Sequence, residues 1–466
     1  MIQSINPATE EVLATFDEFV PDQVEAAIAA AHRAGNDWAR TSLPERGQAL
    51  HRVARYLRDS QARFAQLISR EMGKPIAEAE AEIAKCALTC DFYADNAERF
   101  LAPAPVPSNA AESYVAFEPL GVLLAIMPWN FPFWQVFRCA APALTAGNTV
   151  LLKHASNVPQ CALAIEEVFR AGGLPDGAFR SLLVSGAAVE PIIADPRVHA
   201  VSLTGSSATG AHIAGLAGRA LKKSVLELGG SDPFIVLADA DVPAAAGMAV
   251  RSRFQNAGQS CIAAKRFIVV QEVAEEFERL VAQEVAALPV GDPLERATRI
   301  GPLARVDLRD ALDAQVRLSV QQGATVLVGG QPRSGPGYFY TPTVLTHLSR
   351  QMPVCAQETF GPVAAVIRVG DSEEAIAVAN ATPFGLGANL WTEDIAAARG
   401  LARRIAAGSV FINGMVASDP RLPFGGVKQS GYGRELGEFG IREFVNIQTV
   451  WIGPAQEGPP STTPAE

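Results

Sequence analysis

The run VLLAIM at residues 122–127 decides the fold, because a short and continuously apolar stretch is typical of a strand buried on both faces. Similar runs follow it at Thr149–Leu152, Arg180–Val184 and Ala200–Leu203. Helical patterns lie between these runs, at Pro159–Ala171 and Val189–Ala194. This alternation of strands and helices predicts a parallel sheet with crossover helices.

The same alternation returns towards the C-terminus. Strands are predicted there at Pro233–Leu237, Arg266–Val270, Val363–Arg368 and Ser409–Ile412, with helices at Val273–Ala287, Arg305–Gln322 and Ser372–Ala381. The first hundred residues are predicted to be helical, over Pro21–Ala39 and Pro44–Ala104, because apolar residues recur with a helical period. The chain is therefore predicted to contain two α/β modules, with a cleft between them where a cofactor and a substrate can meet.

The composition is that of an ordinary globular protein, with 466 residues of which 48% are hydrophobic and 19% charged. Lys and Arg number 39 against 49 Asp and Glu, so the formal net charge is −10 and nucleic acid is not expected as a partner. The longest apolar stretch, Gly121–Trp134, contains two prolines and is too short to span a bilayer. No secretory signal is visible, and no membrane association is expected.

Cysteine and histidine usage predicts neither disulfides nor a metal site. The six cysteines are scattered without a Cys-x-x-Cys pair, and the six histidines lack metal-ligand spacing. Cys86 and Cys90 lie four residues apart in a predicted helix, where burial in the core is the expected role. So few cysteines are typical of a protein of the reducing cytoplasm.

Three segments carry side chains suited to nucleophilic catalysis. In FQNAGQSCIAAKR, residues 254–266, Cys261 precedes a predicted helix start that would lower the pKa of its thiol; an inert buried cysteine is the alternative. Glu227 in VLELGG has apolar neighbours that would raise its pKa towards that of a useful general base, unless it is a salt-bridged structural carboxylate. Asn130 in MPWNFPF lies between two prolines, as an oxyanion donor or as a simple turn residue.

Two segments are candidates for a phosphate-binding loop. TGSSATG at Thr204–Gly210 follows a predicted strand and leads into a helix, so its N–H groups can hold a pyrophosphate. GYGRELG at Gly431–Gly437 follows no predicted strand and opens no βαβ unit. The second segment is therefore not expected to bind a dinucleotide.

Together these segments resemble the aldehyde dehydrogenase superfamily over nearly the whole chain. The pieces MPWNFPFW, LLKHAS, LTGSSATG, ELGGSDPFIV, GQSCIAAKRF, ETFGPV and PFGGVKQSGYGRE occur in the order of the family. Within it, KHASNVP and GQSCIAAKRF are most similar to bacterial succinate-semialdehyde dehydrogenases. The resemblance implies two doubly wound α/β domains, one Rossmann-like and one catalytic, plus a small β arm for oligomerisation.

The resemblance also implies the domain boundaries. Residues 1–101 and 118–229 are expected to form the dinucleotide-binding domain, 230–443 the catalytic domain with the nucleophile, 102–117 and 444–453 the oligomerisation arm, and 454–466 a flexible tail. A homodimer or homotetramer in the cytoplasm is therefore expected.

The chemistry of the family implies a role for each candidate. Cys261 is the nucleophile, Asn130 with the Cys261 N–H holds the oxyanion, hydride passes to the nicotinamide, and Glu227 activates the water that hydrolyses the thioester. Lys153 is expected at the adenosine ribose and Glu358 at the nicotinamide ribose hydroxyls. The other residues expected at the cofactor are Trp129, His154, Ala155, Ser156, Gly205, Ser206, Leu228 and Phe360.

The cofactor preference is predicted from Lys153-His154-Ala155-Ser156. Many NAD-preferring relatives carry a glutamate at the position of Ser156, where it would repel a 2′-phosphate. A serine avoids this repulsion, and Lys153 supplies positive charge. NADP is therefore the expected preferred cofactor, with NAD accepted.

The resemblance implies succinate semialdehyde as the substrate, whose distal carboxylate needs a cation. Arg138 and Ser418 match substrate-binding positions of the family, whereas Gln255 stands where some relatives have an arginine. Arg421 or Arg253 is a possible replacement for this charge. In the alternative, Arg138 pairs with a structural carboxylate and the enzyme accepts uncharged aldehydes; glutarate semialdehyde and aliphatic or aromatic aldehydes are the expected secondary substrates.

Two alternative functions are also compatible with these residues. In a CoA-acylating dehydrogenase or an acyltransferase, CoA takes the place of water, and an intact Glu227 favours hydrolysis instead. A noncatalytic homologue would keep only the fold, and the retention of Cys261, Glu227 and Asn130 together is evidence against it.

Overall fold

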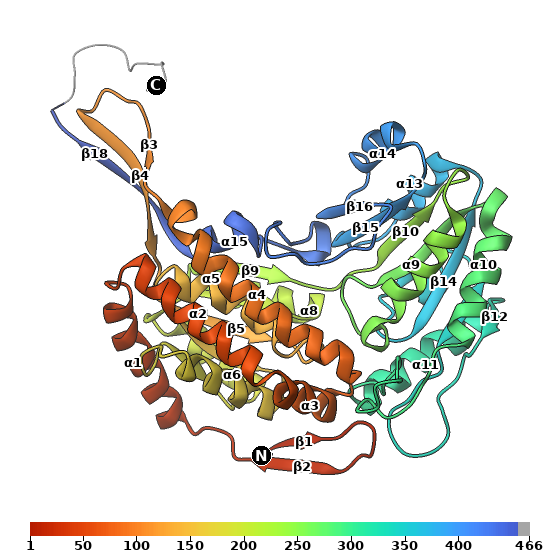
Figure 1. Ribbon diagram of the computed structural model, residues 1–466, viewed down its shortest axis with the longest axis horizontal. Helices are drawn as coiled ribbons and strands as arrows, with labels where there is room; N and C mark the ends of the chain where they lie inside the picture. The colour runs from red at the N-terminus through yellow and green to blue at the C-terminus, as the bar shows by residue number, and fades with distance from the viewer. Residues whose placement is uncertain (455–466) are drawn as a thin grey trace.

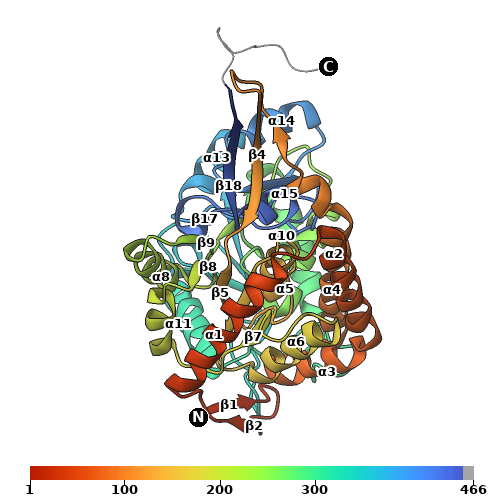
Figure 2. The same cartoon turned by 90° about the vertical axis from the view of Figure 1, so that its left-hand side faces the viewer.

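The computed structural model describes residues 1–454 (Figure 1). It consists of two mainly parallel sheets with their helices and of a thin β arm that extends away from the body (Figures 1 and 2). The fold class predicted from the sequence is confirmed. The predicted flexible tail, 454–466, lies outside the described residues apart from Pro454.

The first sheet has the strand order β17-β9-β8-β5-β6-β7 and is parallel except for β17. Its strands are β5 (Val122–Met127), β6 (Thr149–His154), β7 (Phe179–Ser181), β8 (Val198–Thr204), β9 (Lys223–Glu227) and β17 (Gly431–Tyr432). Alternate residues of β5 enter two different apolar clusters, one on each face of the sheet. Burial on both faces explains why the β5 sequence is continuously apolar.

Helices cover both faces of this sheet. On one face lie α2 (Leu43–Asp59), α3 (Gln61–Met72), α4 (Ile76–Leu101), α5 (Trp134–Thr145) and α6 (Pro159–Ala171). On the other face lie α1 (Pro21–Trp38), α7 (Val189–Ala194) and α8 (Ser207–Arg219). The region predicted to be helical over residues 44–104 forms the three helices α2, α3 and α4. The break between α3 and α4 arises because Gly73 takes a left-handed φ of 81° and Pro75 cannot continue the helical hydrogen bonding.

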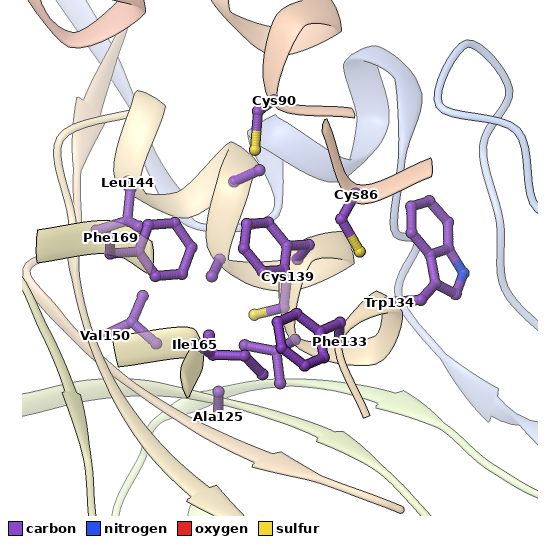
Figure 3. Packing of buried hydrophobic residues seen from close by; sticks show 14 of the residues in the cluster. Cys86, Cys90, Ala125, Phe133, Trp134, Cys139, Leu144, Val150, Ile165 and Phe169 are labelled. Atoms are coloured by element: carbon purple, nitrogen blue, oxygen red, sulfur yellow. The ribbon is translucent and has the colours of Figure 1, made fainter. Parts of the chain in front are cut away.

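The largest apolar cluster fills the space between β5 and helices α4 to α6 (Figure 3). Cys86 and Cys90 point into it from α4 and Cys139 from α5, and all three are fully buried free thiols. Phe137 and Phe169 stack there with ring centroids 4.9 Å apart. The core role predicted for Cys86 and Cys90 is confirmed.

The second sheet has the order β12-β13-β14-β11-β10-β15-β16 and is parallel except for β12. Its strands are β10 (Asp232–Val236), β11 (Ala264–Val270), β12 (Thr325–Val328), β13 (Thr343–Thr346), β14 (Val363–Val369), β15 (Gly387–Trp391) and β16 (Ser409–Ile412). Its helices are α9 (Val242–Phe254), α10 (Gln271–Ala286), α11 (Val306–Gln321), α12 (Pro353–Ala356), α13 (Ser372–Asn380) and α14 (Ile395–Ala402).

After β16 the chain returns to the first sheet. There β17 pairs with β9, and α15 (Gly437–Arg442) packs on α4 and α5. Gly431 lies opposite Glu227 in this pairing. The C-terminal part of the predicted catalytic domain, 230–443, therefore packs against the first sheet and not only against the second.

The arm is an antiparallel three-stranded sheet of β3 (Ala104–Pro105), β4 (Glu112–Pro119) and β18 (Val445–Ile452). β18 pairs with β4 along its whole length, from Val445 opposite Pro119 to Ile452 opposite Glu112.

One structural expectation is wrong at the other end of the chain. The N-terminal residues form a two-stranded ribbon, β1 (Ile2–Ile5) and β2 (Val12–Phe16), in a region predicted to be helical.

Candidate active site

The cofactor residues predicted from the sequence meet at the carboxyl edge of the first sheet. Trp129 follows β5, Gly205 and Ser206 follow β8, and Leu228 follows β9. Lys153 and His154 end β6, and Ala155 and Ser156 come directly after it. The strand order reverses next to β5, since β6 and β7 lie on one side and β8 and β9 on the other. Open α/β sheets bind nucleotides at such a switch point.

The N-terminus of α8 is built for close approach to an anion. Ser206 Oγ accepts the Thr209 N–H at 3.2 Å and caps the helix, and the Gly205 N–H donates to the Glu227 carbonyl at 3.0 Å. A Cβ at Gly210 would lie 2.4 Å from the Leu228 side chain, so only glycine lets the helix pack this closely. The free N–H groups of such a helix end can hold a pyrophosphate, as predicted for residues 204–210.

The end of β6 combines a cation, a buried histidine and an exposed serine. Lys153 is half-buried, which lowers its pKa, and Ser156 is exposed. The His154 ring is buried, with Nε2 2.9 Å from the Pro132 carbonyl oxygen and Nδ1 accepting the Ala155 N–H at 2.9 Å. Burial lowers the pKa of His154 to about 4. A neutral His154 thus supports the turn that carries Asn130, while Lys153 and Ser156 stay available to a ligand.

Two further cofactor candidates come from the segment before β14. Glu358 Oε1 accepts the Gly230 N–H at 3.0 Å and lies 3.1 Å from Lys265 Nζ. Phe360 makes an edge-to-face contact with Trp129, with ring centroids 5.7 Å apart. These contacts bring residues of the second sheet to the carboxyl edge of the first.

Cys261 lies in a loop that enters β11, and the helix start predicted at residues 262–264 is wrong. Parallel pairing of β11 with β10 and β14 overrides the local helical preference of Ile262-Ala263-Ala264. Without a helix N-terminus, burial raises the pKa of the Cys261 thiol to about 11, although the positive charges of Arg138 and Lys265 oppose this rise. The expected lowering of the thiol pKa by a helix dipole is therefore wrong as well.

Hydrogen bonds to backbone carbonyls hold the loop around the thiol. Asn130 Nδ2 donates to the Gln259 carbonyl at 3.1 Å, and Asn256 Nδ2 donates to the Asn130 carbonyl at 2.7 Å. Lys265 Nζ donates to the Cys261 carbonyl at 2.7 Å. Since one N–H of the Asn130 amide is used here, the other can donate to an oxygen on a molecule attached to Cys261. The contribution of Lys265 was not predicted, and a charged residue in a buried strand is the sequence feature that could have indicated it.

Glu227 ends β9 with a buried carboxylate. Within residues 1–454 neither of its carboxylate oxygens has a hydrogen-bond partner, and the residue forms no ion pair. Burial raises its pKa well above the usual range, and the neighbouring Glu435 raises it further. The alternative of a salt-bridged structural glutamate is therefore excluded, and the carboxylate is suited to take a proton from water.

A cavity of about 160 Å³ adjoins the thiol. Cys261, Arg138, Gln255 and Ser418 line it as predicted, together with Lys85 and Trp134, which the sequence analysis did not single out. Arg138 is buried and forms an ion pair with Glu435, and its guanidinium lies 4.6 Å from the centroid of the Phe424 ring. These contacts agree with the alternative in which Arg138 pairs with a structural carboxylate.

The two arginines considered as replacements for the missing charge are engaged elsewhere. Arg421 is exposed and pairs with Asp419 at 2.6 Å. Arg253 is buried and donates to the Thr359 carbonyl at 3.2 Å and to the Gly361 carbonyl. Neither lines the cavity, so neither lies where it could replace the arginine that some relatives have at the position of Gln255.

A thiol, an amide donor and an unpaired carboxylate lie beside the sheet edge that is predicted to bind a dinucleotide. This arrangement suits an oxidoreductase that acts on carbonyl compounds through a covalent thiol adduct. Residues 1–450 match the aldehyde dehydrogenase family, and the chain belongs to that family. It is an NAD(P)-dependent enzyme that oxidises aldehydes to carboxylates. No group of ligating side chains in residues 1–454 could hold a metal ion, and no helix in that range is long and apolar enough to cross a membrane.

Similar proteins cover almost the whole chain. A probable succinate-semialdehyde dehydrogenase [NADP(+)] of Synechocystis sp. is 52% identical over 97% of this chain and 99% of its own length. Succinate-semialdehyde dehydrogenase [NADP(+)] 1 of Mycobacterium tuberculosis is 51% identical over 97% of this chain and 99% of its own length. The structure of a succinic semialdehyde dehydrogenase from Streptococcus pyogenes in complex with NADP+ superposes with a TM-score of 0.95, at 39% identity and over 97% of this chain and 100% of that chain.

Proposed function

We propose that this enzyme oxidises succinate semialdehyde to succinate, with NADP as its preferred cofactor. The observation that carries the substrate is the small cavity beside Cys261, because two cationic side chains, Lys85 and Arg138, line it together with Ser418. A buried guanidinium and a half-buried ammonium favour a substrate with a distal carboxylate over a neutral aldehyde of similar length. Relatives more than half identical to this chain carry the same substrate in their names.

Each catalytic side chain has one step in the proposed reaction. The Cys261 thiol releases its proton to solvent and its sulfur bonds to the aldehyde carbon, while the electron pair of the carbonyl π bond moves to the oxygen, to which the Asn130 amide and the Cys261 N–H donate. When bound, the nicotinamide supplies a hydride acceptor. Glu227 then takes a proton from water, whose oxygen attacks the thioester carbon while the Cys261 sulfur leaves.

The cofactor preference follows from the side chains at the end of β6. Lys153 has a half-buried ammonium without an ion-pair partner in the part of the chain that the structure describes. Ser156 is exposed three residues further on, at a position where a carboxylate would repel a 2′-phosphate. A cation and a hydroxyl at this edge support NADP over NAD.

The proposal is tested by following the absorbance of the reduced nicotinamide with four substrates. Succinate semialdehyde should give a higher kcat/KM than butyraldehyde, glutarate semialdehyde or benzaldehyde, and NADP a higher one than NAD. Equal values for succinate semialdehyde and butyraldehyde would overturn the proposed substrate, and turnover with NAD alone would overturn the proposed cofactor. Release of a CoA thioester when CoA is added would instead support the acylating alternative.

The arm supports a homodimer or homotetramer. Its strand β18 exposes large apolar side chains, with Ile447 63%, Trp451 49% and Ile452 43% exposed. Adjacent exposed apolar side chains on a projecting sheet are typical of a protein interface. Light scattering on the full chain should give a mass of two or four copies, and a monomeric mass would contradict this assignment.

All six cysteines are free thiols, which supports a reducing, cytoplasmic location.

A further inference from the structure

Lys265 is a buried cation beside the catalytic loop that the proposed mechanism does not use. It is the second residue of β11, and its side chain has no exposed surface. Its Nζ donates to the Ser260 carbonyl at 3.0 Å and to the Cys261 carbonyl at 2.7 Å, and it lies 3.1 Å from Glu358 Oε1. An ammonium has three N–H groups, which match these three oxygens in number.

These contacts join three segments that enter neighbouring strands of the second sheet. Cys261 precedes β11, Glu358 precedes β14, and Gly230, whose N–H donates to Glu358 Oε1 at 3.0 Å, precedes β10. A Cβ at Gly230 would lie 2.5 Å from the Cys261 carbonyl oxygen, so only glycine lets these segments approach so closely. Within residues 1–454, Lys265 is the one ion-pair partner of Glu358.

The charge of this ammonium acts on both functional groups next to it. Both contacts to Glu358 are made by Oε1, so Oε2 can accept from a ribose hydroxyl of a bound cofactor. The positive charge of Lys265 lowers the pKa of the Cys261 thiol, whereas the negative charge of Glu358 raises it. Asp232 also responds to this ammonium: burial raises the pKa of Asp232 to about 7, and Lys265 opposes that rise. The two members of one ion pair thus act on the thiol in opposite directions.

We propose that Lys265 is a positioning residue that links the cofactor site to the nucleophile, by holding Glu358 for the nicotinamide ribose and the Cys261 loop for attack on the aldehyde. This inference rests on the proposed roles of Cys261 and Glu358, and it assigns the residue that connects them. Lys265 acts through these two residues and not on the reacting atoms. Its removal should therefore change the reactivity of the thiol before any ligand is bound, and should weaken the binding of NADP.

The first measurement follows the thiol in the enzyme without cofactor or aldehyde. The probe is iodoacetamide at pH 8, and mass spectrometry measures the rate at which Cys261 is alkylated. Because pH 8 lies below the thiol pKa of about 11, this rate is proportional to the thiolate fraction. In Lys265→Met the rate should fall about tenfold, the effect of raising the thiol pKa by about one unit. In Glu358→Gln the rate should instead rise about threefold, because the negative member of the pair is lost.

The matched control is Lys223→Met, which should alkylate at the wild-type rate. Lys223 begins β9 and is paired with Glu443 at 2.9 Å, so the control removes an ion-paired lysine from another part of the molecule. If Lys265→Met does not fold, Lys265→Gln takes its place. This variant keeps N–H donors for the loop carbonyls without the charge, and it should still slow the alkylation of Cys261.

The second measurement is a fluorescence titration with NADP. Lys265→Met and Glu358→Gln should each weaken NADP binding about tenfold, the effect of one lost charge-assisted contact. The double variant should lose less than the product of the two single losses, because both changes break the same ion pair.

Three outcomes would overturn the inference. Alkylation of Lys265→Met or Lys265→Gln at the wild-type rate would show that Lys265 does not act on the thiol. A change in the same direction in Lys265→Met and Glu358→Gln would indicate a loosened loop instead of an effect of charge. Multiplicative losses of NADP affinity in the double variant would show that Lys265 does not act through Glu358.

Neither measurement uses an aldehyde, so a wrong substrate in the proposed function would leave both unchanged. It would be detected in the kcat/KM values alone. A Glu358→Gln variant that binds NADP like the wild type would refute the proposed cofactor contact itself.

Discussion

The two sheets contribute opposite edges to the active site. In the first sheet the functional residues follow the carboxyl ends of strands, as Trp129 does after β5 and Glu227 at the end of β9. In the second sheet they precede the amino ends of strands, since Gly230, Cys261 and Glu358 come just before β10, β11 and β14. The cleft is therefore formed by one carboxyl edge and one amino edge.

The two edges bring different charges and dipoles to the cleft. The carboxyl edge of the first sheet brings the N-terminus of α8 and its free N–H groups to the cleft, which suits the phosphates of a dinucleotide. The amino edge of the second sheet supplies chain that enters a strand, without a helix N-terminus at the thiol. There the charges of Arg138 and Lys265 oppose the rise in the pKa of the Cys261 thiol that burial causes.

The largest expected effect comes from removing the reactive group of the amino edge. Cys261→Ala should reduce aldehyde oxidation by about 10⁴-fold or more, because no covalent step remains, while NADP binding at the carboxyl edge changes little. Steady-state rates and fluorescence titration with NADP measure the two effects. Cys355→Ala, which removes a buried thiol from α12, is the control and should remain active. Residual turnover within tenfold of the wild type would refute the nucleophile.

The ion pair of Arg138 with Glu435 predicts the next largest effect. Arg138→Ala leaves a buried carboxylate without its partner and should lower the free energy of unfolding by about 3–5 kcal/mol, as measured by urea denaturation. Combining Arg138→Met with Glu435→Gln should recover more than half of that loss. The kcat/KM for succinate semialdehyde should fall more in Arg138→Ala than that for butyraldehyde, because only the acid substrate loses a cation of the cavity beside its carboxylate. Equal losses on both substrates would show that Arg138 supports the fold and does not bind the carboxylate.

Glu227 is the residue of the carboxyl edge that is proposed to act on the thiol adduct. Glu227→Gln should slow steady-state turnover about 10²- to 10³-fold while the first burst of reduced cofactor persists, because hydrolysis of the thioester loses its base. The pKa of Glu227 is raised by burial, so wild-type hydrolysis should speed up as rising pH ionises the carboxylate. The variant should lose that pH dependence. Rapid mixing across pH 6–9 measures both, and a normal steady-state rate would exclude Glu227 as the base.

The smallest of these effects concerns the cofactor end of the carboxyl edge. Ser156→Glu should lower kcat/KM for NADP about 100-fold with little change for NAD. Two like charges about 4 Å apart repel by about 4 kcal/mol at an effective dielectric constant of 20, and screening at this exposed position removes about a third of that repulsion. Ser156→Ala is the control and should change the NADP value less than about tenfold. An unaltered NADP preference in Ser156→Glu would show that the end of β6 does not contact the 2′-phosphate.

The elements that were predicted correctly are those with a strong local pattern. α6 (Pro159–Ala171), α7 (Val189–Ala194) and β5 (Val122–Met127) have the bounds expected from the sequence, because periodicity or burial on both faces is visible within each segment. β15 was not predicted, since its sequence GANLW places a polar residue inside the strand. Asn389 is buried there and its Oδ1 accepts the Val416 N–H at 2.9 Å, a partner that the segment itself does not contain.

The sequence by itself determined the family, the two α/β modules and the identity of the candidate nucleophile, base and amide donor, because short motifs around Cys261, Glu227 and Asn130 carry that information. Only the tertiary structure decided the state of these groups and of their neighbours. The raised thiol pKa, the pairing of Arg138 with Glu435 and the contact of Lys85 with Ser418, 333 residues away, depend on burial and on charges brought together from distant segments. Desolvation and Coulomb interactions act through space, so no local pattern of residues records them.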